Sequence, residues 1–153
     1  MKRNIAIVAG GDSSEHEVSL RSAAGLYSFM DKDRYNITIV TLRGSDWQAA
    51  VEWKMEDGQW QTLAAAPIDK NDFSYTYNGE KTQLEYAYIT IHGTPGENGR
   101  LQGYFDMLQI PYSCCGVLAA AVTFNKYTCN HYLQDFGIRI SPSILLRKTM
   151  VRP

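Results

Sequence analysis

Two glycine-containing segments carry the side chains that are best placed to do chemistry. The first, GGDSSEHEVSL (10–20), follows an apolar run and leads into an amphipathic stretch. Two glycines allow a tight turn, and the first turn of the helix that follows offers free N–H groups and a positive dipole end, which favour an anion. Ser14 and Glu17 also have the spacing of a capping box, so local capping is the alternative role for Glu17. The later glycines of a dinucleotide fingerprint are missing, which disfavours NAD.

The second segment, HGTPGENGRLQG (92–103), opens with His92. This histidine follows an apolar run that ends at Ile91, and open α/β sheets bind ligands at the carboxyl ends of their strands. We expect Gly93, Gly96 and Gly99 to let backbone amides approach a small zwitterionic ligand without Cβ atoms in between. The alternative is a merely tight strand–helix loop in which His92 bonds to backbone. If the strands before the two segments are parallel, both segments converge on one edge of the sheet.

A lysine in the last third of the chain is a third candidate. The spacing of apolar residues predicts one long helix over Val117–Phe136, ended by Gly137 as a C-cap glycine. Its apolar stripe comprises Leu118, Val122, Cys129, Leu133 and Phe136. Lys126 lies at the margin of that stripe, where it could meet nucleotide phosphates or simply extend from the surface into solvent.

Composition excludes several classes of protein. The net charge of -1 and the 20% of charged residues give no basic surface for nucleic acid or membranes. Cys114, Cys115 and Cys129 lack a CxxC spacing, so we expect small buried thiols in a reducing compartment rather than a metal site or disulfide. The apolar part of MKRNIAIVAGG is too short for a secretory signal, and no run approaches the ~20 residues of a membrane span. We therefore expect a cytoplasmic location.

The elements that position these residues follow an α/β pattern. Asn4–Ala9 is a predicted strand, a helix follows with Leu20, Ala23, Tyr27 and Met30 on one face, and Tyr35–Leu42 is a second strand. This order predicts a parallel βαβ unit. Residues 45–85 are predicted to form antiparallel hairpins that turn at Asp57-Gly58 and Asn78-Gly79.

The α/β pattern then resumes. The predicted elements are a strand over Glu85–Ile91, a helix over Arg100–Leu108, a short strand at IPYSCC (110–115), the long helix, and a last strand that begins in IRISPSILLRK (138–148). One face of the Arg100–Leu108 helix carries Leu101, Tyr104, Phe105 and Leu108.

Three motifs resemble those of one family, the D-alanine–D-alanine ligases. GGDSSEHEVSL (10–20) resembles the N-terminal signature of that family, and HGTPGENGRLQG (92–103) followed by IPY (110–112) resembles the second signature. FNK (124–126) stands where the family carries an Asp-Lys pair. The chain departs from the pattern at Asn98 and Asn125, where the family usually has aspartate, and at Ala119–Ala121, where Ser-Ala is commoner.

The resemblance implies a fold and an activity. It implies a Rossmann-like (pre-ATP-grasp) parallel sheet over residues 1–116 with a β-hairpin embellishment, and the first helix and strand of an ATP-grasp domain over residues 117–153. Such ligases use ATP and Mg²⁺ (or Mn²⁺) to join two D-alanines through a D-alanyl phosphate, for peptidoglycan precursor synthesis. They are usually homodimers.

The resemblance also assigns roles to single residues. It implies that Glu17 holds the ammonium group of the first D-alanine and that His92 lies near its carboxylate, so both are predicted catalytic and substrate-binding residues. Ser19 and Gly93 are predicted to bind substrate, and Lys126 to contact ATP phosphates. No metal ligand is assigned.

The resemblance further implies that most of the ATP and metal site lies in a part of the family fold that these 153 residues do not contain. We therefore expect the chain alone to be inactive, with an apolar patch exposed on residues 117–136. Two alternatives stay open: a non-catalytic Rossmann-like module that binds a small ligand, and a truncated interaction protein.

Overall fold

The computed structural model describes residues 2–56 and 59–147. Its strands form one seven-stranded sheet in the order β6-β5-β4-β3-β2-β1-β7. The strands are β1 (Arg3–Gly10), β2 (Tyr35–Arg43), β3 (Asp46–Glu56), β4 (Gln59–Asp69), β5 (Ser74–Tyr77), β6 (Glu80–Gln83) and β7 (Tyr86–Ile89). The helices are α1 (His16–Phe29), α2 (Arg100–Met107), α3 (Val117–Phe124) and α4 (Lys126–Gln134). The predicted α/β class is confirmed.

The parallel part of the sheet consists of β2, β1 and β7. Strand β1 lies between the other two and pairs in parallel with both, from Arg3↔Tyr35 to Gly10↔Leu42 on one side and from Ile5↔Tyr86 on the other. Its residues from Ile5 onward are buried, as expected of a central parallel strand made of apolar residues. The predicted β1-α1-β2 unit is confirmed.

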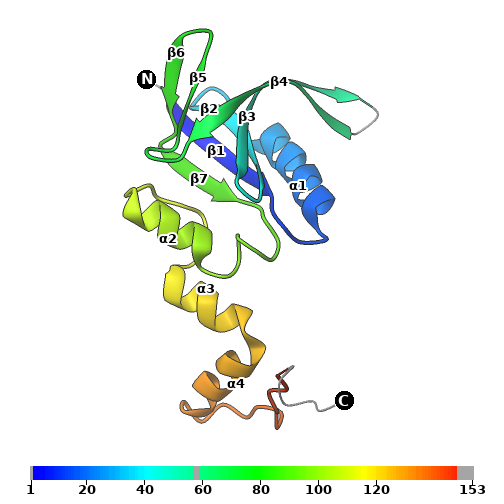
Figure 1. The fold of residues 1–153 in the computed structure, drawn as a ribbon, viewed down its shortest axis with the longest axis vertical. Helices are drawn as coiled ribbons and strands as arrows, with labels where there is room; N and C mark the ends of the chain where they lie inside the picture. Colours follow the sequence, from blue (N-terminus) through cyan, green and yellow to red (C-terminus); the bar gives the residue numbers. More distant parts are fainter. Residues whose placement is uncertain (1, 57–58, 148–153) are drawn as a thin grey trace.

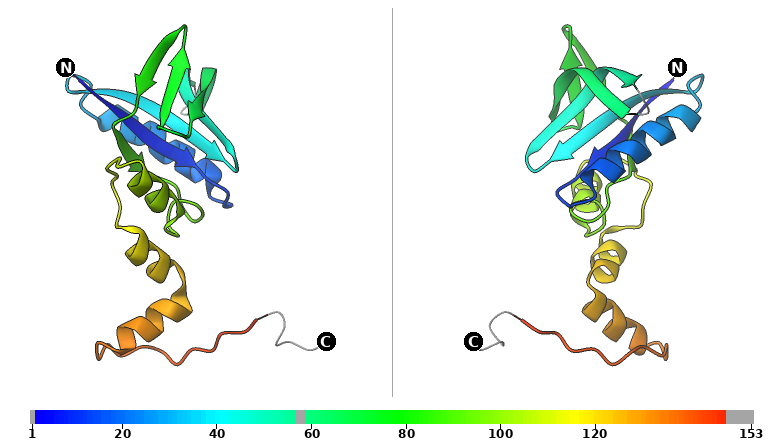
Figure 2. Two further views of the ribbon diagram at one scale, coloured as in Figure 1. Left: turned by 60° about the vertical axis from the view of Figure 1, so that its left-hand side comes forward. Right: turned by 90° about the vertical axis from the view of Figure 1, so that its right-hand side faces the viewer.

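Helices α1 and α2 cover opposite faces of this sheet (Figures 1 and 2). On one face, Ala23 of α1 is buried with Ile7 and Ile39, and the predicted apolar face of α1 packs around them. On the other face, Leu101 and Phe105 of α2 join a larger core. Strands buried on both faces hold the carboxyl ends of β1 and β7 in fixed register.

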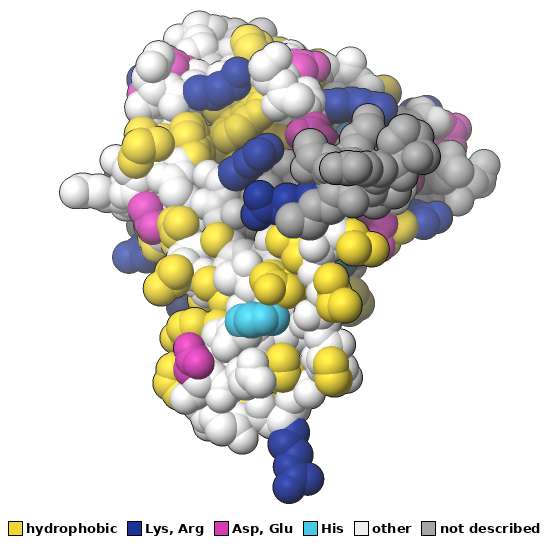
Figure 3. All heavy atoms as spheres, turned by 60° about the horizontal axis from the view of Figure 1, so that its bottom comes forward, with side chains coloured by type: hydrophobic (Ala, Val, Ile, Leu, Met, Phe, Trp, Pro, Cys, Tyr) yellow, Lys and Arg dark blue, Asp and Glu magenta, His cyan; other side chains and the backbone are white. Residues whose placement is uncertain are grey.

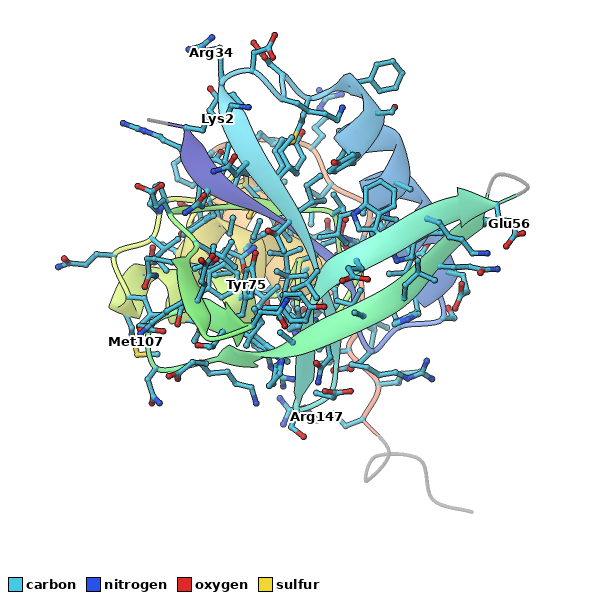
Figure 4. The ribbon with its side chains drawn as sticks, turned by 90° about the horizontal axis from the view of Figure 1, so that it is seen from above. Lys2, Arg34, Glu56, Tyr75, Met107 and Arg147 are labelled. Atoms are coloured by element: carbon cyan, nitrogen blue, oxygen red, sulfur yellow. The ribbon has the colours of Figure 1, made fainter. Side chains whose placement is uncertain are left out.

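The predicted hairpins extend this same sheet. Strand β2 pairs antiparallel with β3, and β3 with β4, which forms an arm that ends at Glu56 (Figure 4). Trp53 and Trp60 stack on the arm with ring centroids 4.1 Å apart, and the edge of Tyr27 from α1 meets Trp53. The predicted turn at Asp57-Gly58 lies outside the described residues.

The second hairpin turns where the sequence predicts. Tyr77 of β5 pairs with Glu80 of β6, which leaves a two-residue connection. Asn78 and Gly79 both have positive φ, at 51° and 81°, as a type I′ turn requires. Asparagine and glycine tolerate this conformation best, so this turn could be read from the sequence.

The prediction of one helix over Val117–Phe136 is wrong. Asn125 has extended dihedrals (φ -89°, ψ 100°) and serves both as C-cap of α3 and as N-cap of α4. Its side-chain oxygen accepts a hydrogen bond from Thr128 N at 3.0 Å. An asparagine side chain can bond to backbone N–H groups and so end one helix and begin the next. The spacing of apolar residues runs across this boundary unchanged, which is why it predicted a single helix.

Two predicted strands are also not formed. IPYSCC contributes only an isolated bridge, Ala87↔Tyr112, and the described part of the last segment, residues 138–147, has no regular structure. A strand needs a neighbour to satisfy its backbone groups, and these segments find little or none among the described residues.

The C-cap prediction is confirmed: Gly137 has φ 75°, with bonds from Gly137 N to Gln134 O and from Ile138 N to Leu133 O.

The C-terminal segments expose apolar side chains, as expected. Helices α3 and α4 and the extended tail lie beyond α2, away from the sheet (Figures 1 and 2). Leu118 is 74% exposed and Phe136 is 67% exposed. Viewed toward this end, apolar side chains are spread over the surface (Figure 3). None of the described helices is long and apolar enough to cross a membrane.

Candidate functional site

The two glycine-containing segments lie against each other at the carboxyl ends of β1 and β7. Asp12 N donates to Thr94 O at 2.9 Å, and Ser13 Oγ donates to His92 O at 2.8 Å. We call residues 10–15 the first loop and residues 92–99 the second loop. Because β1 and β7 are parallel neighbours, the predicted convergence of the two loops on one sheet edge is confirmed.

Three of the glycines in these loops are required by internal packing, a role that the sequence did not predict. A Cβ on Gly11 would lie 2.5 Å from Ile91 Cγ2, and one on Gly96 would lie 2.5 Å from Ile91 O. A Cβ on Gly99, whose φ is 86°, would lie 3.0 Å from Val117 O of α3. The backbone therefore approaches Ile91 and α3 closely at these positions, whether or not a ligand is bound.

Ser19 of α1 links the end of β1 to the residue that follows β7, and it does not reach the surface. Its side chain is fully buried, its hydroxyl accepts from Gly10 N at 2.9 Å, and it donates to Thr90 O at 2.9 Å. A ligand could reach it only if these bonds were broken. The structure therefore gives Ser19 a role in positioning the two loops, in place of the substrate contact expected from the sequence.

Glu17, in the first turn of α1, and His92, at the start of the second loop, are both exposed. The capping-box alternative for Glu17 is not formed, because Glu15 is the N-cap of α1 and makes no side-chain capping bond. Among residues 2–56 and 59–147, neither the Glu17 carboxylate nor the His92 ring has a hydrogen-bond or ion-pair partner. Both groups remain available to a ligand.

The second loop is braced from within by two side chains for which the sequence predicted no such role, those of Glu97 and Asn98. Glu97 Oε2 accepts from Gly93 N at 2.7 Å, and Asn98 Nδ2 donates to Thr94 Oγ1 at 2.9 Å. The Gly93 amide, predicted to bind substrate, is thus occupied by Glu97. In the sequence, this role of Glu97 could have been inferred only from its position between Gly96 and Gly99 in the second motif, where a carboxylate can accept from a nearby backbone N–H.

Lys126 lies in a cleft between the second loop and helices α2, α3 and α4, and not among the residues through which the two loops contact each other. The cleft has a volume of about 320 Å³ and is lined by Gly96, Glu97, Gln102, Cys114, Cys115, Ala120, Thr123, Phe124 and Lys126. Lys126 is exposed and its Nζ donates to Thr123 O at 3.0 Å. Of the predicted site residues, only Lys126 lines this cleft, which it shares with Gly96 and Glu97 of the second loop.

The cysteines beside the cleft are not the buried thiols expected from the sequence. Cys114 and Cys115 are exposed, Cys129 is half-buried, and all three are free. Cys114 Sγ lies 3.1 Å from Gln102 Nε2, and partial burial raises the pKa of the Cys114 thiol. The segment that carries Cys114 and Cys115 pairs with β7 only through Tyr112, so most of its side chains face outward.

The chemistry open to this edge is recognition of a small charged ligand. An exposed carboxylate and an exposed imidazole suit an ammonium group and a carboxylate, respectively, and the cleft adds the ammonium of Lys126 for phosphate oxygens. Within the described part of the chain, no group of three or more His, Cys, Asp or Glu side chains could hold a metal ion. No magnesium ligand is therefore assigned.

Sequence comparison finds a matching family model, and relatives that align with nearly the whole chain. Residues 4–115 match the family described as "D-ala D-ala ligase N-terminus". The chain is 63% identical to a D-alanine–D-alanine ligase of Phocaeicola vulgatus and 60% identical to one of Bacteroides thetaiotaomicron, over 148 residues in each case. These alignments cover 97% of this chain but only 43% of each relative.

Solved structures agree with the fold. The crystal structure of the D-alanine–D-alanine ligase from Aeromonas hydrophila superposes with a TM-score of 0.75 at 27% identity, over 97% of this chain and 52% of that one. The match includes both loops, since it extends over nearly the whole chain. The chain belongs to the D-Ala-D-Ala ligase N-terminus family.

Proposed function

We propose that this chain supplies the wall of a D-alanine–D-alanine ligase that binds the first D-alanine. The observation that carries the proposal is the direct contact between the two loops, through Asp12 to Thr94 and Ser13 to His92. Both loops carry family motifs, and the contact brings the exposed Glu17 and His92 to one sheet edge. Through this site, the chain would take part in the ligase activity after which its longer relatives are named.

We assign each residue a separate role. Glu17 receives the substrate ammonium group as a charge-assisted partner, and His92 donates to the substrate carboxylate. Ser19 and the Glu97–Gly93 contact hold the loops in place. Lys126 meets phosphate oxygens of ATP in the cleft. ATP would activate the carboxylate of the first D-alanine as an acyl phosphate, and Mg²⁺ (or Mn²⁺) would be held mainly by residues outside this chain.

Thermal unfolding with amino acids tests the substrate role. We expect D-alanine to raise the Tm of the chain more than L-alanine does, because a ligand that binds only the folded state stabilises it. Glu17→Gln should abolish the D-alanine shift. Glu15→Gln is the matched control, because it removes the same charge from the same helix end at a residue without a capping bond. Equal shifts for the two enantiomers, or an unchanged shift in Glu17→Gln, would contradict the proposal.

We also propose that these 153 residues do not catalyse ligation by themselves. Phosphoryl transfer depends on placed cations and metal ions around the phosphates, and the described residues supply Lys126 to the cleft but no metal cluster. An assay of phosphate release with ATP, Mg²⁺ and D-alanine should show no turnover above that of a Glu17→Gln control. Turnover at the rate of a full-length ligase would contradict this part.

Three further expectations belong to the same proposal. The division into residues 1–116 and 117–153 is supported by a family match that ends at residue 115 and by α3, which begins at Val117. A cytoplasmic location and a homodimer are what a ligase of peptidoglycan precursors implies. Sedimentation equilibrium measures the second of these: a dimer mass supports it, and a monomer at all concentrations contradicts it.

A further inference from the structure

Two adjacent thiols open onto the cleft that contains Lys126. Cys114 and Cys115 both line it, and both are exposed, whereas Cys129 on α4 is half-buried and lies outside the lining. The proposed function gives these thiols no role. Free thiols beside a cleft of about 320 Å³ are open to reaction with small molecules that fit there.

The two thiols differ in their surroundings. Cys114 Sγ accepts a hydrogen bond from Gln102 Nε2, and burial raises the pKa of the Cys114 thiol, which lowers its thiolate fraction at neutral pH. Cys115 has no hydrogen-bond partner within residues 2–56 and 59–147. Cys115 is therefore the thiol of the pair that lines the cleft without its sulfur being held by a neighbouring side chain.

Gln102 makes the Cys114 side of the cleft a fixed wall. Its side chain is 1% exposed, and its Nε2 donates both to Gly96 O at 2.6 Å and to Cys114 Sγ. Its Oε1 is buried without a partner. A buried amide with both donors in use ties Cys114 to the second loop, and leaves Cys115 as the thiol that can move toward a reagent.

We infer that Cys115 is a site of thiol–disulfide exchange with small disulfides, and that the adduct fills the cleft beside Lys126. The Cys115 thiolate attacks one sulfur of the disulfide RSSR, a new S–S bond forms, and RS⁻ leaves. The departing thiolate takes up a proton equal to the one that Cys115 lost. Cys115 is oxidised and the departing sulfur is reduced, so the step needs no other reagent.

The adduct would control access to Lys126. A mixed disulfide in the cleft excludes phosphate oxygens from the lysine, so modification and phosphate binding compete; this consequence, but not the exchange itself, rests on the proposed function. Competition is reciprocal, so a phosphate ligand must also protect Cys115 from the reagent.

Mass spectrometry of the native chain treated with oxidised glutathione tests the exchange. We expect the adduct at Cys115 to form about tenfold faster than at Cys114 or Cys129, because Cys115 lines the cleft with its sulfur unrestrained, whereas Gln102 holds Cys114 Sγ and Cys129 is half-buried outside the lining. Cys115→Ser should remove the fast phase, and Cys129→Ser, the matched control, should keep it. Peptide mapping in urea gives the intrinsic rate of each thiol in the unfolded chain.

The outcomes separate this inference from the proposed function. Adducts spread over the three cysteines as in urea, or formed first at Cys129, would overturn the inference. Tripolyphosphate should slow the exchange at Cys115 severalfold without affecting Cys129, and Lys126→Met should remove that protection. Fast exchange at Cys115 without protection would support the thiol site and overturn the phosphate role of Lys126.

Discussion

The two parts of this chain differ in how much of their own apolar surface they bury. In residues 3–113, α1 and α2 cover opposite faces of the sheet, and both core clusters lie there. In residues 117–147, which the structure describes throughout, Ala120 is the one buried apolar side chain, and Leu118, Phe136, Ile144 and Leu146 are at least two-thirds exposed. The first part holds its half of the site in place, whereas Lys126 lies on helices with few internal supports.

The two sides of the candidate site therefore differ in how firmly the fold holds them. The Glu17–His92 side rests on strands in register and on bonds between buried groups, such as those of Ser19. On the Lys126 side, α3 and α4 meet at Asn125, which caps α4, and most of their apolar side chains are exposed. Substitutions in each part, and one pair that spans both, measure the contrast.

The largest effect should come from a matched pair of phenylalanines. Phe105 is fully buried against Phe73 and Tyr112, whereas Phe136 is 67% exposed. We expect Phe105→Ala to lower the free energy of unfolding by about 3–5 kcal/mol, and Phe136→Ala by less than about 0.5 kcal/mol. Urea unfolding followed by tryptophan fluorescence measures both. Similar losses in the free energy of unfolding would contradict the difference in burial between the two parts.

A pair of glycines gives the next effect. Gly10 has φ 94° and a Cβ there would lie 2.5 Å from Leu42 O, whereas a Cβ on Gly25 of α1 meets nothing within 4 Å. Gly10→Ala should destabilise the fold by about 2–4 kcal/mol, through left-handed strain and a clash with backbone. Gly25→Ala should stabilise it by about 0.5–1 kcal/mol, because alanine favours a helix interior. Urea unfolding measures both free energies, and a Gly10→Ala variant as stable as the wild type would contradict the turn geometry at Gly10.

A smaller effect tests the helix break on the Lys126 side. Asn125 Oδ1 accepts from Thr128 N, so Asn125→Ala should cost about 1 kcal/mol of helix stability and speed amide exchange in α4 about fivefold. Asn125→Asp should keep the cap and the slower exchange. Exchange in α2 should be the same in both variants. Faster exchange in α2 would mean that the two parts are coupled more tightly than their packing indicates.

The smallest effect concerns an ion pair in the hairpin region. The hydrogen bond from Lys81 to Asp72, at 2.6 Å, lowers the pKa of Asp72 from its ordinary 3.8, with further help from Ser74. A depressed folded-state pKa stabilises the fold above pH 3.8, and this stabilisation is lost as pH falls through the lower folded value. The difference in urea midpoint between the wild type and Asp72→Asn should therefore shrink between pH 7 and pH 3. A difference in urea midpoint that stays the same from pH 7 to pH 3 would contradict the stabilising role of the Asp72–Lys81 pair.

Much of the first part could be predicted from the sequence because local and tertiary preferences agree there. The apolar run before Gly10 could only be a buried strand, and Asn78-Gly79 fits the positive φ that its turn needs. The convergence of the loops followed from a parallel β1-β7 pair. The packing role of the glycines could not be predicted from the sequence, because the close approach of Gly11 and Gly96 to Ile91 depends on how the two loops fold together.

The second part could not be predicted in the same way. The apolar spacing through Asn125 matched one helix, but the side chain of Asn125 caps a new one. The segment after Gly137 has strand-like residues but finds no neighbouring strand among the described residues. The outward position of Cys114 and Cys115 depends on a segment that pairs with β7 at Tyr112 alone.

The central claim is that the two loops form one substrate-binding edge. A titration of ¹⁵N-labelled chain with D-alanine, followed by NMR, tests it most directly. We predict that amides of residues 10–20 and of residues 92–99 shift together with a single dissociation constant, and that L-alanine leaves them nearly unchanged. Shifts confined to one loop, or shifts elsewhere on the sheet, would contradict the account.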